Sequence, residues 1–520
     1  MQKFLYRSLG FLTLLATLSA FAAGQAGHVV VIVWDGMRPD FISPEHTPTL
    51  YQLAHDGVKF ENHHAVYCSA TEVNGTALAT GAYPGHSGIV ANRDYLPPIE
   101  PLKVVDVQSY DVVRTGDDLT GGKYLLRPTL AEILRRAGKS TAVAGTKEIA
   151  LLHDRREHPD TDGAGVTLFE GKTIPAAALA PIKNRLGEFP AGVSATSAAP
   201  NSPRDEWTTR ALLGSLWSNG VPAFSLLWLS EPDFSQHATG PGSPKALAAL
   251  ESSDQKLAAV LAELDRRGLR DQTDVFVVSD HGFSTIDKSV DVCKTLQDGG
   301  FAATREFKSP PKQDDILVVG QGGSVLFYLT GHDAKTAGRL VTFLQQQDFA
   351  GVIFTRTKLP GTFSLADVNL NSPHAPDVVL SLRWTTNSSA IGVPGMLYGD
   401  GGRKPGQGLH ASLSRFDMHN TLVGAGPDLK KGFADTLPTG NTDLAPTILW
   451  LLGVKPTVTM DGRILSEALT GRAPKAGKPV TKKIETQRVL GTSVWRQYLQ
   501  ISRVKGTVYF DEGNGGQTAK

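Results

Sequence analysis

Three short apolar segments of this chain each lead into acidic or imidazole side chains. The segments, with the polar residues that follow them, are 28–34 with Asp35, 224–229 with Asp233 and His237, and 274–279 with Asp280 and His281. Such apolar runs are typical of parallel strands buried on both faces. In open α/β sheets, ligands bind beyond the carboxyl ends of these strands. One terminal Asp is typical of a helix cap, but three ends, two of them with histidine, indicate a functional site on one sheet edge.

Helical segments alternate with the apolar strands. The predicted helices and the strands that follow them are 129–137 with 140–144, 205–217 with 224–229, and 244–267 with 274–279. This alternation produces a parallel sheet that is covered by helices on both faces. The sequence therefore predicts an α/β fold with a mostly parallel central sheet flanked by helices, and a smaller inserted cap region.

The same pattern divides the chain into five consecutive segments. They are a signal peptide (1–22), the first part of the α/β core (27–283), an insertion or cap (284–367), the second part of the core (368–470) and a C-terminal extension with late strands (471–520). The insertion directly follows Asp280 and His281, so we expect it to lie beside the site. The central sheet is expected to resume at 377–382.

The N-terminal segment is typical of a secretory signal. Lys3 and Arg7 precede the apolar run 11–18, and Ala20-Phe21-Ala22 offers small residues for cleavage. The apolar run is too short to span a bilayer, and no later run is long enough. A periplasmic or secreted protein without a membrane span is therefore predicted.

Charge and cysteine content argue against two further classes of protein. With 52 Lys and Arg against 51 Asp and Glu, the chain lacks the basic excess of a general nucleic-acid binder. Cys68 and Cys293 are too few for a disulfide framework, and whether they pair is left open. Stability must therefore come from the packed core.

The side chains at the strand ends are good ligands for zinc or a similar ion. A later histidine, His410 or His419, can complete the set. Six ligands exceed the needs of one tetrahedral ion, so two ions, each with three protein ligands and an open position, fit better. Paired ions about 4 Å apart can clamp the attacking and leaving oxygens of a phosphoryl transfer.

A hydroxyl nucleophile is available in the segment Cys68-Ser69-Ala70-Thr71. This segment precedes a helix-like stretch that ends at Gly81, and backbone N–H groups at a helix start favour an anion. Metal coordination lowers the pKa of a hydroxyl and activates it as a nucleophile. On these grounds Ser69 and Thr71 are equivalent candidates.

Several motifs occur together in one order along the chain. They are DGMRPD at 35–40, TPTL at 47–50, Thr71 with TGAYP at 80–84, EPDFSQH at 231–237, SDHG at 279–282, DLAPT at 443–447 and MDGR at 460–463. In this order the chain resembles the alkaline phosphatase superfamily, and within it the nucleotide pyrophosphatase/phosphodiesterase branch. The resemblance covers residues 29–465, most of the predicted mature chain.

The resemblance implies an exported two-zinc phosphoesterase whose nucleophile, Thr71, forms a phosphothreonine. The implied zinc ligands are Asp35, Thr71, Asp280 and His281 for one ion, and Asp233, His237 and His410 for the other. His410 is preferred to His419 because it opens the segment that ends in Gly426-Pro427, although Ala411 follows it where the family usually has Gly. Manganese or iron at one site stays open.

Further residues match positions that bind substrate in the family. Asn92 matches a phosphate-binding Asn and would donate to a phosphoryl oxygen, with the backbone N–H of Glu72 helping. Lys147 matches the lysine that binds phosphate in related monoesterases. Asn74 lies closer to Thr71, but local hydrogen bonding in its helix is its predicted task.

The resemblance leaves four functions to be weighed. A sulfatase is set aside, because the segment 68–72 lacks the Pro and Arg of the Cys/Ser-x-Pro-x-Arg motif. Phosphomonoesterases of this kind use a Lys-x-Arg pair, and here Ile149 replaces the Arg, unless Arg155 or Arg156 substitutes in space. A phosphodiester, pyrophosphate or nucleotide substrate is therefore predicted. The alternatives are a phosphomonoesterase and a secreted binding protein that kept the fold.

Overall fold

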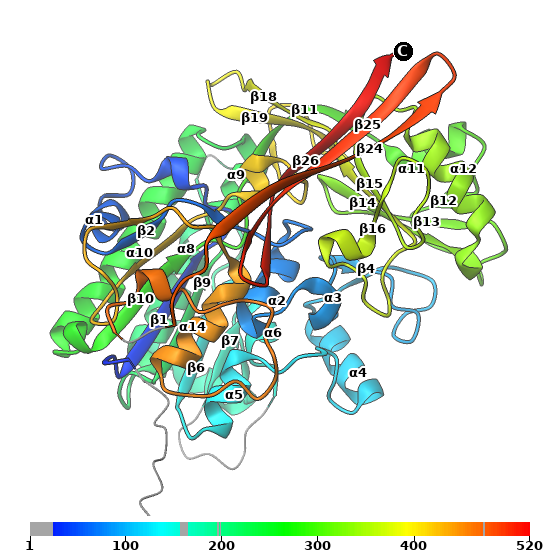
Figure 1. Ribbon diagram of the computed structural model, residues 1–520. Coiled ribbons are helices and arrows are strands. Elements are labelled where there is room, and N and C mark those ends of the chain that lie inside the picture. Colours follow the sequence, from blue (N-terminus) through cyan, green and yellow to red (C-terminus); the bar gives the residue numbers. More distant parts are fainter. Residues whose placement is uncertain (1–23, 157–164, 195–196, 198, 472–473) are drawn as a thin grey trace, which may run out of the picture.

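A nine-stranded mixed sheet forms the centre of the larger part of the molecule (Figure 1). The computed structural model describes residues 24–156, 165–194, 197, 199–471 and 474–520, so the predicted signal peptide lies outside the described residues. In sheet order the strands are β22 (Phe433–Asp435), β2 (Val58–Phe60), β21 (Leu422–Ala425), β10 (Thr273–Val278), β1 (His28–Trp34), β9 (Phe224–Leu229), β6 (Thr141–Gly145), β7 (Thr167–Phe169) and β8 (Lys172–Ile174).

The strands from β10 to β7 run parallel to their neighbours, whereas β21 is antiparallel to β10 and to β2. The predicted mostly parallel α/β sheet is thus confirmed. Consecutive side chains of β1 enter opposite cores: Val29 and Val31 belong to one apolar cluster, and Val30 and Ile32 belong to the other. This alternation is what a strand covered on both faces requires.

Helices cover both faces of the sheet. One face packs against α1 (Pro48–Asp56), α7 (Leu179–Leu186), α8 (Ser202–Ala211) and α10 (Pro244–Arg266), and the other against α2 (Thr71–Thr80), α4 (Tyr110–Thr120), α5 (Leu130–Arg136), α6 (Ala150–His153) and α14 (Leu444–Leu451). Among the described helices, none combines the length and the apolar character that a bilayer crossing needs.

Two smaller sheets lie between β10 and β21 in the sequence, on the right and at the top of Figure 1. The six-stranded sheet contains β12 (Ala303–Thr304), β13 (Ile316–Gly320), β14 (Ser324–Leu329), β17 (Val378–Leu382), β15 (Ala350–Thr355) and β16 (Phe363–Ser364). The four-stranded sheet contains β18 (Trp384–Ser388), β19 (Pro394–Asp400), β11 (Ser284–Val290) and β20 (Gly408–Leu409). The helices of this region include α11 (Val292–Asp298) and α12 (Ala334–Leu344).

The expectation that the central sheet resumes at 377–382 is wrong. β17 pairs antiparallel with β14 and β15 inside the six-stranded sheet, and the chain returns to the central sheet at β21. Both sheets offer fully buried positions, so the apolar run of β17 does not reveal which sheet it joins. The predicted boundary at residue 367 therefore cuts across this sheet, while the division into domains stays a prediction.

The C-terminal segment forms three long antiparallel strands. They are β24 (Pro479–Leu490), β25 (Ser493–Val504) and β26 (Thr507–Ala519), which cross the upper part of Figure 1. The hydroxyl of Tyr509 donates to Asp443 beside α14 (2.8 Å), and Gln497 accepts a hydrogen bond from the backbone N–H of Ile353 in β15 (2.9 Å). These strands therefore join the central core to the six-stranded sheet.

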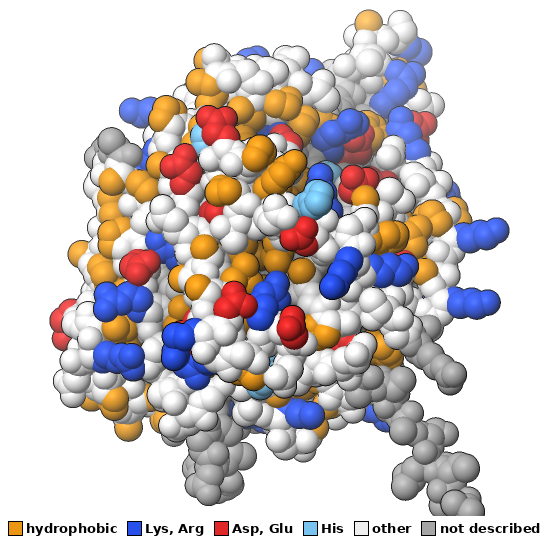
Figure 2. Space-filling model, turned by 90° about the vertical axis from the view of Figure 1, so that its left-hand side faces the viewer, with side chains coloured by type: hydrophobic (Ala, Val, Ile, Leu, Met, Phe, Trp, Pro, Cys, Tyr) orange, Lys and Arg blue, Asp and Glu red, His pale blue; other side chains and the backbone are white. Residues whose placement is uncertain are grey.

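Two further sequence features can be placed on the structure. Cys68 and Cys293 are both buried and both free, so the two cysteines do not pair. On the face shown in Figure 2, basic and acidic side chains are interspersed rather than gathered into one basic surface. This distribution agrees with the near balance of charge in the sequence.

Candidate active site

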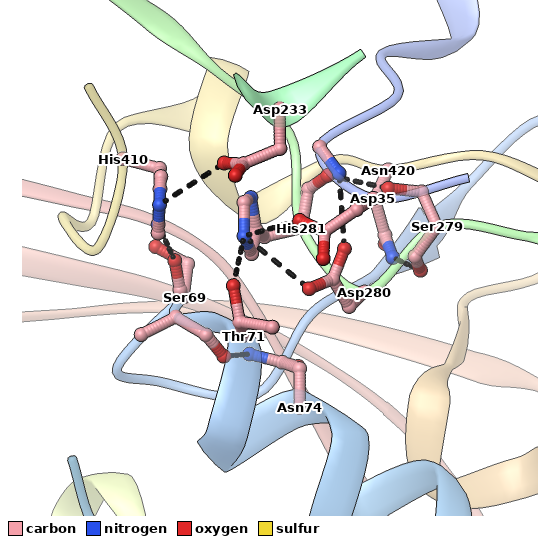
Figure 3. A network of polar contacts seen from close by, with 12 residues as sticks. Asp35, Ser69, Thr71, Asn74, Asp233, Ser279, Asp280, His281, His410 and Asn420 are labelled. Atoms are coloured by element: carbon pink, nitrogen blue, oxygen red, sulfur yellow. Dashed lines mark hydrogen bonds and ion pairs between the residues drawn. The ribbon is translucent and has the colours of Figure 1, made fainter. Parts of the chain in front are cut away.

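The carboxyl ends of three neighbouring parallel strands carry the predicted ligands (Figure 3). Asp35 directly follows β1, and Asp280 and His281 lie just beyond β10. Asp233 is the first residue of α9 (Asp233–Thr239), which follows β9, and His237 lies one turn later on the same helix. Because β10, β1 and β9 are adjacent, side chains that are far apart in sequence meet at one edge.

Thr71 is the first residue of α2 and points at this edge (Figure 3). Its Oγ1 lies 3.2 Å from Nε2 of His281. Ser69, the other candidate, donates its hydroxyl to the backbone oxygen of Ser412 (2.7 Å). The structure therefore brings Thr71, and not Ser69, into contact with the ligand cluster through its hydroxyl.

Asn74 shapes the segment that leads into Thr71. Its side-chain amide donates to the backbone oxygens of Val66, Cys68 and Ala70, each at 3.1 Å. Its Oδ1 accepts from the backbone N–H of Val66 (2.7 Å) and from Asn441 (2.9 Å). This local bonding is the task predicted for Asn74, and it fixes the position of the first turn of α2.

Two clusters of ligand atoms share Asp233. The first contains Asp233, His237 and His410, and the second contains Asp35, Asp233 and His281. Asp233 Oδ1 lies 3.2 Å from Nε2 of His237 and 3.6 Å from Nε2 of His410. Asp280 Oδ2 lies 3.3 Å from Nε2 of His281, at the border of the second cluster. His419 is in neither cluster, and its Nε2 bonds the backbone oxygen of Glu61 (3.0 Å).

The three imidazoles share one hydrogen-bonding pattern. Nδ1 of His237 bonds the backbone oxygen of Gly408 (3.1 Å), Nδ1 of His410 that of Ser69 (2.9 Å), and Nδ1 of His281 that of Gly282 (2.9 Å). A carbonyl oxygen only accepts, so each Nδ1 carries the proton and donates it. Each Nε2 then directs its lone pair into the cluster, which is the orientation of metal-binding histidines.

Several carboxylate oxygens in this cluster are buried without a hydrogen-bond partner. They are Oδ1 of Asp35, Oδ1 of Asp233 and Oδ2 of Asp280. Buried polar atoms are normally satisfied, because an unpartnered one loses its hydration without compensation. Imidazole lone pairs and carboxylate oxygens that face one another repel unless a cation lies between them. The donor set therefore fits bound metal ions.

The electrostatics of the acids lead to the same conclusion. Burial, together with the nearby Asp280, raises the pKa of Asp35 to about 8. Burial also raises the pKa of Asp280 to about 7. Burial opposes ionisation of Asp233 too, but Lys147 and His237 outweigh it and hold its pKa well below the usual range. Positive charge at this edge is thus what keeps closely spaced carboxylates ionised.

Lys147 and Asn92 reach the site from two different segments. Lys147 follows β6, and its ammonium group lies 2.7 Å from Asp233 and 2.9 Å from Asp35. Asn92 accepts a hydrogen bond through Oδ1 from the backbone N–H of Glu72 (3.1 Å). This N–H therefore orients the amide of Asn92, and the binding of a phosphoryl oxygen by Asn92 stays a prediction.

Arg155 and Arg156 do not replace the missing arginine of the Lys-x-Arg pair. The guanidinium of Arg155 is fully buried and bonds Asp117 (3.0 Å) and Glu132 (2.9 Å). Arg156 bonds the backbone oxygen of Gly122 beside the same two acids. Both side chains thus stabilise a buried ion cluster next to α5.

Sequence reasoning missed two residues beside the ligands. The indole N–H of Trp228 donates to Oδ2 of Asp35 (2.8 Å), so it fixes the orientation of that carboxylate. The sequence signal that could have identified Trp228 is its place near the carboxyl end of β9, where it pairs with Val33 near the carboxyl end of β1. Arg403 bonds the backbone oxygen of His237 (3.2 Å) from a glycine-rich loop, and no pattern in the sequence links the two.

Comparisons with known proteins identify relatives of the chain. The model of the type I phosphodiesterase/nucleotide pyrophosphatase family matches residues 29–389. Human ectonucleotide pyrophosphatase/phosphodiesterase family member 7 is 24% identical over 285 residues, 53% of this chain and 53% of that protein. The bis(5'-adenosyl)-triphosphatase enpp4 of Xenopus laevis is 23% identical over 261 residues, 49% of this chain and 47% of that protein. The chain thus spans about half the length of these curated relatives.

Solved structures with the same fold cover more of the chain. Murine ectonucleotide pyrophosphatase/phosphodiesterase 5 superposes with a TM-score of 0.59 at 16% identity, covering 85% of this chain and 100% of that one. Its human counterpart gives a TM-score of 0.57 at 17% identity, with the same coverage. The family match extends over more than half of the residues, and the fold agrees with it. The chain belongs to the type I phosphodiesterase/nucleotide pyrophosphatase family, within the alkaline phosphatase superfamily.

Proposed function

We propose that the protein is an exported two-zinc phosphoesterase that cleaves phosphodiester or pyrophosphate bonds through a phosphothreonine intermediate. The observation that carries this proposal is the position of the Thr71 hydroxyl, 3.2 Å from His281 at the edge of the two ligand clusters. A hydroxyl at a helix start beside clustered metal ligands is the arrangement that an activated nucleophile requires.

The residues present fit two metal ions. Asp35, Thr71, Asp280 and His281 would hold one ion, and Asp233, His237 and His410 would hold the other. When bound, zinc lowers the pKa of a coordinated hydroxyl and offsets the negative charge that develops on oxygen atoms around phosphorus. The nitrogen and oxygen ligands suit zinc, and manganese or iron at one site is the alternative.

The chain itself supplies the nucleophile and orients the substrate. Thr71 loses its hydroxyl proton to solvent, and its Oγ1 forms a bond to phosphorus while the bond to the leaving oxygen breaks. The leaving oxygen departs with the electron pair of that bond. Water then attacks phosphorus, which restores Thr71 and releases the phosphate product. The amide of Asn92 donates to a phosphoryl oxygen, and Lys147 adds positive charge beside Asp35.

The relatives support phosphodiester or pyrophosphate chemistry. The matched family is named for phosphodiesterases and nucleotide pyrophosphatases, and one curated relative is a bis(5'-adenosyl)-triphosphatase. A solved structure of the murine protein is an inactive threonine-to-alanine variant in complex with AMP. Nucleotides and small phosphate esters are therefore the substrates that we propose for this chain, and a periplasmic or secreted location accompanies the proposed export.

Two other functions fit the structure less well. A phosphomonoesterase needs extra positive charge for the additional negative charge of a monoester, but Ile149 is apolar and buried, and Arg155 is engaged with Asp117 and Glu132. A binding protein that lost catalysis would be expected to lack a ligand. All seven ligand positions carry a competent side chain, and these lie at one edge of the sheet.

The decisive experiment compares two esters with the same leaving group. We expect a higher kcat/KM for bis(p-nitrophenyl) phosphate than for p-nitrophenyl phosphate at neutral to alkaline pH, because the shared leaving group makes recognition the variable. A clear preference for the monoester would contradict the diesterase proposal. Lys147→Ala separates the two functions, since it should abolish a monoester preference if Lys147 supplies the extra charge.

A further inference from the structure

A glycine-rich loop brings one more cation to the ligand clusters. Residues 401–407, GGRKPGQ, connect β19 to β20 and precede His410. Gly401, Gly402 and Gly406 have φ values of 103°, 81° and 86°, a region that favours glycine over other residues. The loop carries Arg403 to α9, where Nη1 donates to the backbone oxygen of His237 (3.2 Å).

Hydrogen bonds to β11 and α9 hold the loop in place. The backbone N–H of Gly406 donates to the oxygen of Ile286 in β11 (2.9 Å), and the side chain of Gln407 donates to the oxygen of Ala238 in α9 (3.3 Å). The hydroxyl of Ser289 in β11 donates to the backbone oxygen of Arg403 itself. The position of Arg403 is therefore set by the fold before any substrate arrives.

The guanidinium of Arg403 has N–H donors that are available to bind a ligand. Within the described part of the chain, no carboxylate lies within 4.0 Å of it, and its interaction with His237 uses one of five N–H donors. The side chain is half-buried, and its charge lies within electrostatic range of Asp233 and His237. A partly desolvated arginine without a carboxylate partner is suited to bind a phosphate group.

The geometry of the reaction places this arginine at the leaving-group end. Thr71 contacts His281, so the attacking oxygen approaches from the cluster that contains His281. In an in-line displacement the leaving oxygen lies on the opposite side of phosphorus. In the proposed two-ion arrangement the leaving oxygen meets the other cluster, which contains His237, and Arg403 contacts the backbone oxygen of His237.

We propose that Arg403 is a specificity-determining residue that binds a phosphate in the leaving group, so that the enzyme prefers phosphoanhydrides to esters with an uncharged leaving group. This inference rests on the proposed function, because it assigns the substrate class of the same site. In such a substrate, Thr71 Oγ1 bonds to one phosphorus while the bridging oxygen departs with its electron pair as part of the second phosphate. Arg403 binds that second phosphate throughout the step.

A simpler role for Arg403 makes a different prediction. His237 lies in the last turn of α9, and a cation that bonds the carbonyl groups there stabilises the helix. If this were its whole task, replacing it would lower stability and would reduce turnover of all substrates alike. A role in specificity instead requires that the loss depend on the charge of the leaving group.

The test uses two substrates that transfer the same nucleotidyl group. One is a nucleoside 5'-triphosphate, which releases pyrophosphate, and the other is the p-nitrophenyl ester of the same nucleoside 5'-monophosphate. In Arg403→Gln we expect kcat/KM for the triphosphate to fall roughly tenfold to a hundredfold, as for the loss of a charged hydrogen bond. The value for the aryl ester should change by less than about threefold, because its leaving group lacks phosphate.

Two controls keep the outcomes distinct. Arg339→Gln, at an exposed position on α12, should leave both values unchanged. Arg403→Lys retains the charge but not the planar fork, so it should give an intermediate loss on the triphosphate and also serves if the Gln variant folds poorly. An equal fall on both substrates, or no fall on either, would overturn the role of Arg403. If the wild-type enzyme cleaved neither substrate, the proposed function itself would be wrong.

Discussion

The two nucleophile candidates, Ser69 and Thr71, differ in what their hydroxyl groups contact. Thr71→Ala should lower turnover by several orders of magnitude while metal content falls only modestly, because the carboxylates and imidazoles remain in place. Thr71→Ser should keep more activity, since it retains a hydroxyl at the helix start. The measurements are kcat on an aryl diester and elemental analysis of each variant.

Ser69→Ala is the matched control for this prediction. The hydroxyl of Ser69 is buried and donates to Ser412, so its loss should affect stability more than turnover. Severe loss of activity in Ser69→Ala with mild loss in Thr71→Ala would reverse the assignment of the nucleophile.

At the scale of elements, strand β10 has an acidic residue near each of its ends, and only one of the two lies beside the candidate metal ligands. Asp280 lies beyond its carboxyl end among candidate metal ligands, whereas Asp274 lies near its start, remote from them. Oδ1 of Asp274 accepts from the backbone N–H of Asp428 (3.2 Å), and its Oδ2 is buried without a hydrogen-bond partner. Burial, with the neighbouring Asp428, raises the pKa of Asp274 to about 8.

This shift predicts how stability depends on pH. The pKa of Asp274 is higher in the folded chain than the ordinary value of about 4 in the unfolded chain. Its contribution to stability is therefore fully present below about pH 4 and is lost as the pH rises towards 8, by up to about 1.4 kcal/mol per pH unit. Asp274→Asn cannot ionise, so its Tm should exceed that of the wild type at pH 8, with little difference at pH 4.

The control for this prediction is Asp271→Asn, at an exposed position shortly before β10. It should follow the wild-type profile of Tm against pH. Parallel profiles for the wild type and Asp274→Asn would mean that folding does not raise the pKa of Asp274.

Elements with strong local patterns could be predicted from the sequence, and long-range placements could not. The strands β1, β9 and β10 follow from apolar runs that end in Asp35, Asp233 and Asp280, because period and termini are local features. The sheet that β17 joins depends on partners far away in the chain, and its apolar run fits either sheet. The ion-pair partners of Arg155 could not be predicted from the sequence either, because no sequence spacing relates Arg155 to Asp117.

In the site, too, residues that belong to local motifs could be predicted, whereas contacts between distant segments could not. The motifs name Thr71, His281 and His410, and the structure brings these residues together. The hydrogen bond from Glu72 to Asn92 and the loop that carries Arg403 depend on the fold around them. Sequence patterns therefore indicate which residues belong to the site, but not which hydrogen bonds orient their side chains.

For the molecule as a whole, bound metal should decide both activity and stability. Protein purified without chelator should contain two transition-metal ions per chain by elemental analysis, because the ligand set exceeds the needs of one ion. Chelation should lower Tm and remove activity, since the apposed carboxylates lose their screening charge, and added zinc should restore both.

Asp280→Ala provides a variant with the same expected defect. It should lose most activity and bind less metal than the wild type, because its carboxylate faces His281 across the second cluster. A reproducible content of one ion or less per wild-type chain would rule out the two-metal arrangement.

The strands at the C-terminal end determine when this molecule can finish folding. Tyr509 of β26 bonds Asp443 in the core, and Gln497 of β25 bonds Ile353 in the six-stranded sheet. While the ribosome is still translating residues 490–510, these connections between the two parts do not exist. The two parts also touch directly, as where the hydroxyls of Tyr67 and Ser324 lie 2.8 Å apart, so the C-terminal strands add the last of these links. The links made by Tyr509 and Gln497 are thus formed only after residues 490–510 have been synthesised, whatever folds before them.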